Sequence, residues 1–330
     1  MTTEKKTMKL KIILISLLIT TSAFGQLGTP LSQYSGNQLL FNPAVAGLGD
    51  ALAVNLSVRR QWVQLPGAPS LLSLNAHLPM RNQRHGLGVI IQREEWGPMV
   101  GNFVYFNYAY HIQIHGNILS LGVQAGLYNN VINWNRIGHV RDPDDPTLGQ
   151  GREGHTNFDA NLGIFWVTRG YYFGFSVKHL APPRLNFEQD IPTNDQWHPH
   201  PTTQFFLMSG YEISLRNRDF TLRPEWFMRY AHGTPLAVNL GLHVVYRNRF
   251  FVGTNVQTGQ RMLSFSARGF ITDNIRLGYS YNLYFGPIRS AQLGTHEISL
   301  SYLHNNIWEP PQRHRRPQQH RRPPNRQRWR

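Results

Sequence analysis

Apolar and polar side chains alternate with a period of two along most of this chain. In the segment 275–284, IRLGYSYNLY, the odd positions are apolar or aromatic, and the even positions are polar or small. Such a segment forms a two-faced β-strand. A strand tilted by about 45° needs roughly 9 to 11 residues to cross a bilayer, so this segment is long enough to do so. A strand in a protein core could show the same pattern, and the direction of the apolar row decides between the two.

The same alternation, bounded by Gly, Asn, Asp and Pro, predicts about fourteen strands. Their number is even, as in bacterial single-chain outer-membrane barrels. We therefore expect an all-β fold, a transmembrane antiparallel up-and-down β-barrel. The predicted strands are 51–61, 70–78, 86–93, 102–113, 118–129, 157–168, 171–180, 203–213, 220–230, 236–246, 249–257, 262–271, 275–284 and 295–304.

The links between the predicted strands alternate in length. Links after even-numbered strands are short, such as 169–170 and 247–248, whereas three links after odd-numbered strands are long: 130–156, 181–202 and 285–294. Outer-membrane barrels have short periplasmic turns on one rim and longer extracellular loops on the other. A β-sandwich has no reason to sort its links in this way. The link lengths therefore favour a barrel in the outer membrane, with the odd-numbered links outside.

Charged side chains in the predicted strands fall on the face opposite the apolar row. An Arg or Lys on the lipid face near the bilayer centre costs about 2–4 kcal/mol, so these charges belong inside the barrel. About fourteen strands enclose a lumen too wide for their own side chains to fill, so the lumen is either wet or plugged. The candidate lumen charges are Lys178, Arg223, Glu225, Arg229, Arg268, Arg276 and Glu297.

Two predicted strands depart from the simple pattern. Strand 102–113 is aromatic on both faces, which fits an aromatic girdle or a plugged lumen. Pro224 lies within strand 220–230 and cannot donate a hydrogen bond to the ladder. Both features weaken the alternation locally.

The N-terminus has the features of a secretory signal peptide. Four lysines between 5 and 11 precede an apolar run from 12 to 19, and Ala23-Phe24-Gly25 predicts cleavage after Gly25. No other stretch approaches 18 apolar residues, so we expect no membrane-spanning helix in the mature protein. The chain then divides into a signal peptide (1–25), a periplasmic lead-in segment (26–50) that could fold back into the barrel, an outer-membrane barrel (51–304) and a tail (305–330).

Composition narrows the chemistry. The chain has no cysteine, which excludes disulfides, thiolate metal sites and a lipid-acceptor cysteine. Glycine-rich phosphate loops, a Gly-x-Ser-x-Gly elbow and HExxH are absent, so we expect neither an enzyme nor a bound cofactor. The acidic segment 141–146 and the pair His198 and His200 lack the further ligands that Ca²⁺ or Zn²⁺ require, so we expect no metal.

The formal charge of +15 is concentrated at the two ends of the chain. Four lysines lie in the signal peptide and eight arginines lie after Ile307. We expect the tail to be disordered in the periplasm, because Pro- and Arg-rich sequence cannot bury a core. It suits an acidic periplasmic partner or anionic lipid head groups. An exported chain rarely meets nucleic acid, so none is expected as a partner.

A distinctive series of motifs begins before the first predicted strand. The sequence FNPAVAG at 41–47 is followed by RRQWVQLPGAPSLLSLNAHLP at 59–79, HGLGV at 85–89 and WGP at 96–98. In this order the motifs resemble those of the PorP/SprF family of type IX secretion outer-membrane proteins of the Bacteroidetes. The resemblance is strong across about 30–130 and continues as a pattern of strands to about 304. The basic tail departs from what we expect of the family.

The resemblance implies a non-enzymatic outer-membrane barrel that works with the type IX export and gliding machinery. Family members are associated with the periplasmic ring and motor, or with export and retention of large surface adhesins. The expected partners are outer-membrane lipid, type IX secretion components and a secreted surface protein. The alternatives are a passive outer-membrane pore or uptake channel, and a soluble secreted β-protein that binds polyanions. The candidate docking residues, whose turns could instead serve only to clamp the entry to the barrel, are Phe41, Asn42, Pro43, Gly47, Arg60, Gln61, Trp62, Gly67 and Pro69.

Overall fold

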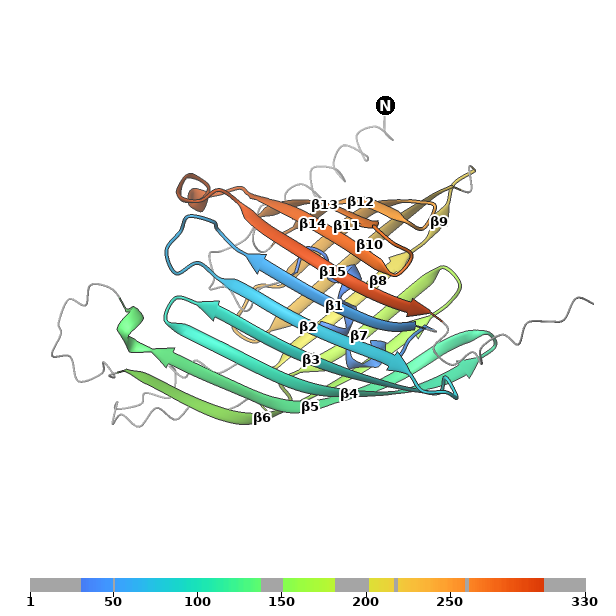
Figure 1. The fold of residues 1–330 in the computed structure, drawn as a ribbon, viewed down its shortest axis with the longest axis horizontal. Helices are drawn as coiled ribbons and strands as arrows, with labels where there is room; N and C mark the ends of the chain where they lie inside the picture. The colour runs from blue at the N-terminus through green and yellow to red at the C-terminus, as the bar shows by residue number, and fades with distance from the viewer. Residues whose placement is uncertain are drawn as a thin grey trace, which may run out of the picture.

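The fold is a closed antiparallel β-barrel (Figure 1). The computed structural model describes residues 31–49, 51–137, 151–181, 202–216, 219–258 and 261–305. Within these ranges each strand pairs with its neighbours in sequence, except that β8 and β9 both pair with β10, and β1 pairs with β15, so the sheet is closed. An open edge in hydrocarbon would leave backbone N–H and C=O groups unpaired at several kcal/mol each. The predicted fold class is confirmed.

Fifteen strand segments make fourteen wall strands in the described part of the chain, because β8 and β9 both pair with β10 along one line. Each predicted strand has a counterpart. The lengths differ most for the third to sixth strands, which are longer in the structure than predicted. The segments are β1 (Ala51–Arg60), β2 (Ser70–Pro79), β3 (His85–Trp96), β4 (Met99–Ile114), β5 (Asn117–Asn133), β6 (Arg152–Val167), β7 (Tyr171–Lys178), β8 (Gln204–Tyr211), β9 (Ile213–Ser214), β10 (Phe220–Ala231), β11 (Ala237–Tyr246), β12 (Phe250–Gln257), β13 (Met262–Phe270), β14 (Ile275–Tyr284) and β15 (Thr295–Asn305).

The two faces of each strand differ as the alternation predicts. On β14, Leu277 and Tyr279 are 44% and 45% exposed, whereas Ser280 and Asn282 are fully buried. The exposed rows of neighbouring strands are apolar as well, and they form one band around the outside of the barrel. The apolar rows therefore face outward, and the polar rows face the lumen.

A ladder of polar side chains marks the end of the apolar band on one side of the barrel. Arg93 donates to Asn102, Asn102 to Asn129 and Asn129 to Thr156, each pair lying directly opposite one another on adjacent strands. Strands β3 to β6 continue past this ladder, and β5 and β6 extend furthest at this rim (Figure 1). Since these outward side chains can form hydrogen bonds and carry charge, the ladder lies where the lipid-facing surface ends.

Short and long links lie at opposite rims of the barrel (Figure 1). The short-link rim carries 80–84, 115–116 and 168–170, together with the turns that follow β9, β11 and β13. The links that contain 138–150 and 182–201 belong to the other rim, and the acidic segment 141–146 and the pair His198 and His200 lie outside the described residues. No helix in the described ranges is long and apolar enough to cross a membrane.

The predicted strand 203–213 is interrupted at Glu212, which separates β8 from β9. Across this interruption β10 pairs Leu222 with Ile213 and Glu225 with Gly210, so positions 223 and 224 have no partner on that side. Pro224 lies in this gap. Because proline has no N–H, the gap places it where a ladder bond is already missing.

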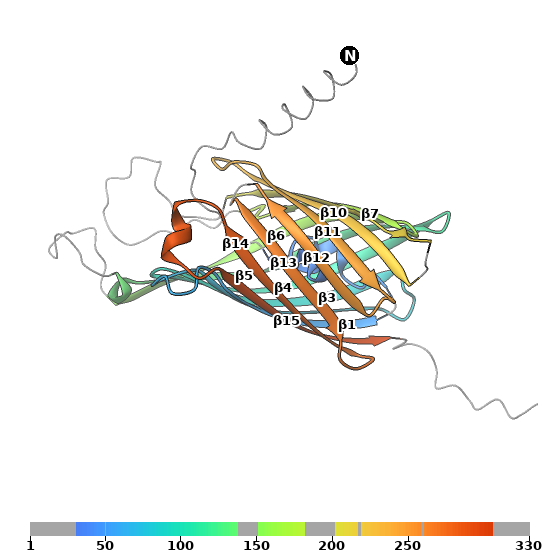
Figure 2. The same cartoon turned by 90° about the horizontal axis from the view of Figure 1, so that it is seen from above.

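Residues 31–49, here called the lumen segment, lie inside the barrel (Figures 1 and 2). The sequence predicts a lead-in segment over 26–50 that could fold back into the barrel, and the described part of this segment lies between the walls. Leu31, Tyr34, Leu39 and Ala44 are among the most buried residues of the protein. The lumen segment buries apolar side chains that a periplasmic segment would expose, which stabilises its position in the lumen.

The lumen segment explains the aromatic character of β4 on both faces. Phe106, Tyr108 and Tyr110 point outward, whereas Phe103 and Tyr105 point inward and pack against the apolar cluster that the lumen segment forms. Of the two explanations open at the sequence level, a girdle applies to the outer row and a plugged lumen to the inner row.

Replacing Leu162 by Arg should destabilise the barrel by about 2–4 kcal/mol, because a guanidinium would enter the apolar band near the middle of β6. Leu162 is 48% exposed on the outer face. Thr156→Arg, six positions away on the same row and at the polar ladder, should cost at most about 1 kcal/mol. Urea unfolding of both variants in lipid vesicles measures the difference. Equal costs at the two positions would contradict the placement of the band.

Candidate functional site

Three short 3-10 turns shape the lumen segment: η1 (Tyr34–Gly36), η2 (Gln38–Leu40) and η3 (Pro43–Val45). Asn42 caps η3, since its side chain accepts a hydrogen bond of 2.9 Å from the N–H of Ala44. Pro43 occupies the first turn position, where its missing N–H costs nothing. Gly47 and Gly49 have φ of 67° and 90° and lead the chain toward β1. The FNPAVAG motif is thus a capped turn followed by a glycine exit.

The FNPAVAG motif is held by hydrogen bonds to the wall near the short-link rim. Nδ2 of Asn42 donates to the carbonyls of Ile164 (3.0 Å) and Phe175 (3.1 Å), which lie opposite each other on β6 and β7. In the other direction, wall side chains donate to carbonyls of the segment. These bonds run from Ser176 Oγ to Phe41 (2.6 Å), from Ser120 Oγ to Ala44 (2.6 Å) and from Lys178 Nζ to Leu40 (3.2 Å).

Three wall glycines let the motif approach the strands closely. A Cβ on Gly163 would lie 2.0 Å from Oδ1 of Asn42, and one on Gly122 would lie 2.1 Å from the amide nitrogen of Ala44. A Cβ on Gly86 would lie 2.0 Å from the carbonyl oxygen of Ala46. No real Cβ makes contacts this short, so the wall needs glycine at these positions. We call Gly86, Gly122 and Gly163 the glycine cradle.

The start of the lumen segment is held by a buried carboxylate on β15. Glu297 accepts hydrogen bonds from the backbone N–H groups of Ser32 (2.9 Å) and Gln33 (3.1 Å). Nη1 of Arg59, on the neighbouring strand β1, lies 3.2 Å from the same carboxylate, and both side chains are fully buried. A buried ion pair is tolerated when further hydrogen bonds satisfy its remaining groups. The Glu297 carboxylate thus joins the two closing strands to the lumen segment.

Aromatic rings fill the space between these two attachments. The ring of Phe227 lies 5.1 Å from Tyr34 and 5.0 Å from Phe41, and Phe41 lies 5.9 Å from Phe206. Burial, together with the nearby Glu225 carboxylate, raises the pKa of Tyr34 well above its usual value, so its hydroxyl stays neutral. The lumen segment therefore has an apolar centre with polar attachments on both sides.

The structure separates the candidate docking residues into two groups. Phe41, Asn42, Pro43 and Gly47 belong to the lumen segment, where Asn42 and Pro43 are buried. The other group begins at the end of β1 and lies at the opposite rim, in the turn between β1 and β2, where Gln61 N donates to Pro69 O (2.9 Å) and Trp62 N to Thr295 Oγ1 (3.1 Å). This second group contains Arg60, Gln61, Trp62, Gly67 and Pro69. The two groups do not form one surface.

The seven candidate lumen charges all lie on inward rows, at different depths. Glu297 holds the start of the lumen segment, Lys178 contacts the carbonyl of Leu40, and Arg229 lies on the same row of β10 as Glu225. Arg223, Arg268 and Arg276 gather around the ring of Phe251, at 5.8, 5.2 and 5.8 Å from its centre. Arg268 also donates to Ser35 Oγ (3.0 Å).

Two buried groups were missed by sequence reasoning. Arg59 follows Asn55 and Ser57 on the inward row of β1, and this alternation could have identified it. Asp159 accepts from the hydroxyl of Tyr105 (2.7 Å) and lies 2.8 Å from Nδ1 of His179. The inward position of Asp159 on β6 could have been found in the same way, whereas its partners on β4 and after β7 could not.

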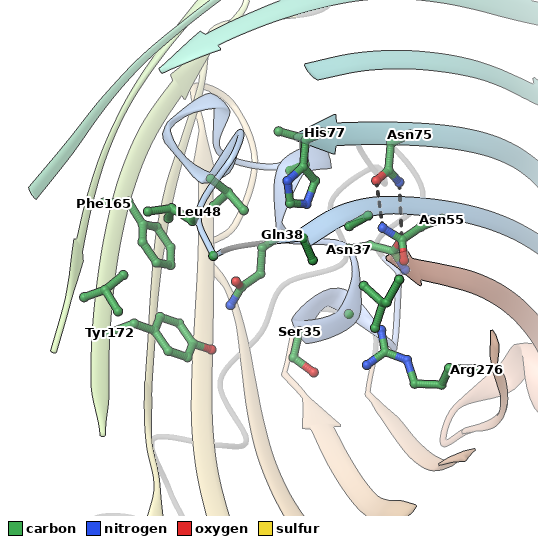
Figure 3. Close-up of a pocket in the computed structure, with 18 of the residues that line it drawn as sticks. Ser35, Asn37, Gln38, Leu48, Asn55, Asn75, His77, Phe165, Tyr172 and Arg276 are labelled. Atoms are coloured by element: carbon green, nitrogen blue, oxygen red, sulfur yellow. Dashed lines mark hydrogen bonds between the residues drawn. The ribbon is translucent and has the colours of Figure 1, made fainter. Parts of the chain in front are cut away.

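A cavity of about 410 Å³ lies between the lumen segment and the wall at the short-link rim (Figure 3). Its wall residues come from strand ends at that rim, such as Ala51, Val167 and Leu303. We call it the periplasmic vestibule, because short links lie on the periplasmic side of outer-membrane barrels. Side chains of Asn37, Asn55 and Asn75 form a hydrogen-bonded row on one side of it (Figure 3).

Comparison with known proteins identifies the family. Residues 23–302 match the family model of the type IX secretion system membrane protein PorP/SprF, which is most of the chain. The chain belongs to the PorP/SprF family. With its fourteen-strand barrel, this PorP/SprF protein is located in the outer membrane. No curated protein matches the chain.

Solved structures similar to this PorP/SprF protein are outer-membrane barrels. The CymD monoaromatic hydrocarbon channel aligns with a TM-score of 0.51 and 11% identity, over 86% of this chain and 94% of that chain. Omp33 of Acinetobacter baumannii aligns with a TM-score of 0.45 and 9% identity, over 78% of this chain and 99% of that chain. At such low identity, the likeness to CymD concerns the fold alone.

Replacing Gly122 or Gly163 by Ala should displace the FNPAVAG motif, because the added Cβ would overlap Ala44 or Asn42. Since the chain has no cysteine, Val45→Cys provides a single reporter for a membrane-impermeant maleimide. Val45 is buried, so labelling should be slow in the parent and at least about tenfold faster in either cradle variant, if displacement is favoured by about 1.4 kcal/mol. Gly170→Ala, which meets only one atom at 3.6 Å, is the matched control. Slow labelling in all variants would contradict the cradle.

Replacing Glu297 by Leu should lower the free energy of unfolding by about 3–5 kcal/mol, because Arg59 would remain buried without its partner. The double variant Arg59→Leu with Glu297→Leu should recover part of this loss, since no unpaired charge remains. Urea unfolding of the parent, both single variants and the double variant in detergent micelles completes the cycle. Additive losses would show that the pair does not act as a unit.

Proposed function

We propose that this protein is a non-enzymatic accessory barrel of the type IX secretion machinery. In this role it supports the export or surface retention of a secreted adhesin, or docks to the periplasmic ring and motor. The family is a secretion-system membrane component, and the proposal refines that general role for this chain.

The observation that carries the proposal is the occupied lumen. The lumen segment is attached to β6 and β7 through Asn42 and to β15 through Glu297, which are on opposite sides of the barrel. Its centre is packed with aromatic rings. A barrel filled in this way suits a scaffold that presents surfaces at its rims better than a passage for solutes.

Each rim offers features that suit partner binding. At the outer rim, β3 to β6 extend past the polar ladder and carry an exposed ion-pair group, in which Glu95 contacts Arg93 (2.8 Å) and Arg136 (3.4 Å). At the other rim, the periplasmic vestibule reaches the lumen segment. The outer rim therefore suits an exported surface protein, and the short-link rim suits a periplasmic component.

A passive channel is the rival function. The printed name of CymD describes a monoaromatic hydrocarbon channel, and its 11% identity to this chain supports no transfer of that activity. Single-channel conductance of the purified barrel tests the rival directly. The parent should conduct poorly and a variant without residues 31–45 should conduct, because the attachments of the lumen segment are removed. A steady open pore in the parent would overturn the accessory role.

Crosslinking in intact envelopes, followed by pull-down of a tagged chain, should recover a type IX secretion component or a secreted surface protein. A photo-crosslinker at Glu95 should capture partners at the outer rim, and one at Arg249, an exposed side chain of the short-link rim, should capture periplasmic partners. Leu162, on the lipid face, is the control position. Capture of lipid alone at all three positions would contradict the proposal.

A further inference from the structure

We infer that the periplasmic vestibule is a binding site for an acidic peptide segment of a periplasmic partner, with one carboxylate held by Arg276 and Arg223. The inference rests on the proposed function and specifies the chemistry of the partner that binds at the short-link rim. Four features support it: the position of the cavity, the guanidinium of Arg276 that has no ion-pair partner among the described residues, the unpartnered hydrogen-bonding atoms and the apolar wall.

The vestibule is accessible from the short-link rim. Gly49 is exposed and lines the cavity, and Arg276 lies at the second position of β14, beside the turn that starts the strand. The lumen segment forms the floor, through residues from Ser35 to Leu39 and through Leu48. A volume of about 410 Å³ is within the range of protein ligand sites. A partner can therefore reach the cavity without displacing the lumen segment.

Arg223 and Arg276 line one end of the vestibule and share the ring of Phe251 with Arg268, which does not line the cavity. Glu212 and Glu225 also line the vestibule, so three guanidinium groups face two carboxylates and leave one positive charge in excess. Glu212 pairs with Arg223 at this rim. Arg268 is buried and interacts electrostatically with Glu225. Arg276 makes no ion pair with any described residue, and its one hydrogen bond is a long contact of 3.4 Å to Ser301 Oγ. A guanidinium binds a carboxylate in a two-point arrangement, so Arg276 has the capacity to accept one.

Unused hydrogen-bonding atoms in the vestibule include both donors and acceptors. Among the described residues that line the cavity, Nε of Arg223, Oδ1 of Asn55, the hydroxyl of Tyr172 and both carboxylate oxygens of Glu225 are buried without a hydrogen-bond partner. Buried polar atoms are normally satisfied, so these atoms favour a ligand that supplies an acceptor for Arg223 and several N–H donors for the oxygens. A peptide with an acidic side chain carries both a carboxylate and backbone N–H groups. A simple fatty acid or inorganic anion lacks the N–H.

Apolar side chains lie across the vestibule from Arg276 (Figure 3). Leu48 and Phe165 line this opposite side, next to Tyr172. They offer a surface for an apolar side chain next to the acidic residue. The ligand class is therefore an extended peptide in which Asp or Glu neighbours an apolar residue.

The chain's own tail is the competing occupant. Residues 306–330 follow β15, whose Leu303 lines the vestibule. The tail carries eight arginines after Ile307, which the guanidinium cluster repels. Charge therefore favours an acidic partner over the tail.

The test is fluorescence anisotropy of the labelled peptide Gly-Ser-Leu-Asp-Phe-Gly-amide with the full chain in detergent micelles. Binding should weaken at least about tenfold with Arg276→Gln, because the charge-assisted hydrogen bonds between the guanidinium and the peptide carboxylate are lost. The same loss should follow from replacing Asp by Asn in the peptide. Arg249→Gln is the matched control, since Arg249 is exposed at the same rim and pairs with Asp273 (3.0 Å).

Each alternative has its own outcome. Binding that is unchanged by Arg276→Gln, or equal for the Asn peptide, would overturn the inference. Displacement of the peptide by millimolar acetate as readily as by unlabelled peptide would assign the site to small anions. Binding seen only after deletion of 306–330 would assign the site to the tail. Either the acetate result or the tail result would overturn the inference that the site binds a partner peptide. Loss of partners in the envelope pull-down with Arg276-dependent peptide binding intact would remove the proposed function and leave the site.

Discussion

A ring of fourteen strands encloses more space than its own inward side chains can fill. The inward rows are also polar, so the lumen must supply hydrogen-bond partners as well as volume. This protein meets both needs with residues from before the first strand. The lumen segment brings Leu31, Tyr34 and Phe41 as filling, and it brings backbone groups that accept from Ser120, Ser176 and Lys178. Barrel width thus explains why an N-terminal segment is part of the folded body.

Much of the fold could be predicted from local sequence. The alternation in 275–284 identified both the strand and its lipid face, because side-chain direction in a strand depends only on parity. The lengths of the links separated the two rims, because a link's length can be read directly from the sequence between two predicted strands. The interruption at Glu212 was not predicted, since it depends on how β10 pairs with β8 and β9 rather than on the sequence of one strand.

The candidate site was harder to predict because its contacts join distant parts of the chain. The turn at Asn42 and Pro43 is a local feature, and the sequence indicated it. The glycine cradle is not local: Gly122 and Gly163 resemble ordinary small inward residues until the backbone of Ala44 and the side chain of Asn42 are placed against them. The 3-10 turns of the lumen segment carry no sustained periodicity, so a path through the barrel could not be read from them. Family resemblance indicated a type IX secretion membrane protein and did not supply this geometry.

The Glu297 attachment has a consequence for assembly. Ser32 and Gln33 come from the first described residues of the chain, and the carboxylate that binds them lies 265 and 264 residues later on the last strand. The same carboxylate contacts Arg59 on β1, the strand that β15 meets when the ring closes. The lumen segment, which precedes every strand, therefore cannot acquire this anchor until the last strand, β15, is in place. Closure of the barrel and attachment of the lumen segment to Glu297 therefore occur in one late step. An intermediate that lacks β15 has an open sheet edge and a lumen segment without this attachment.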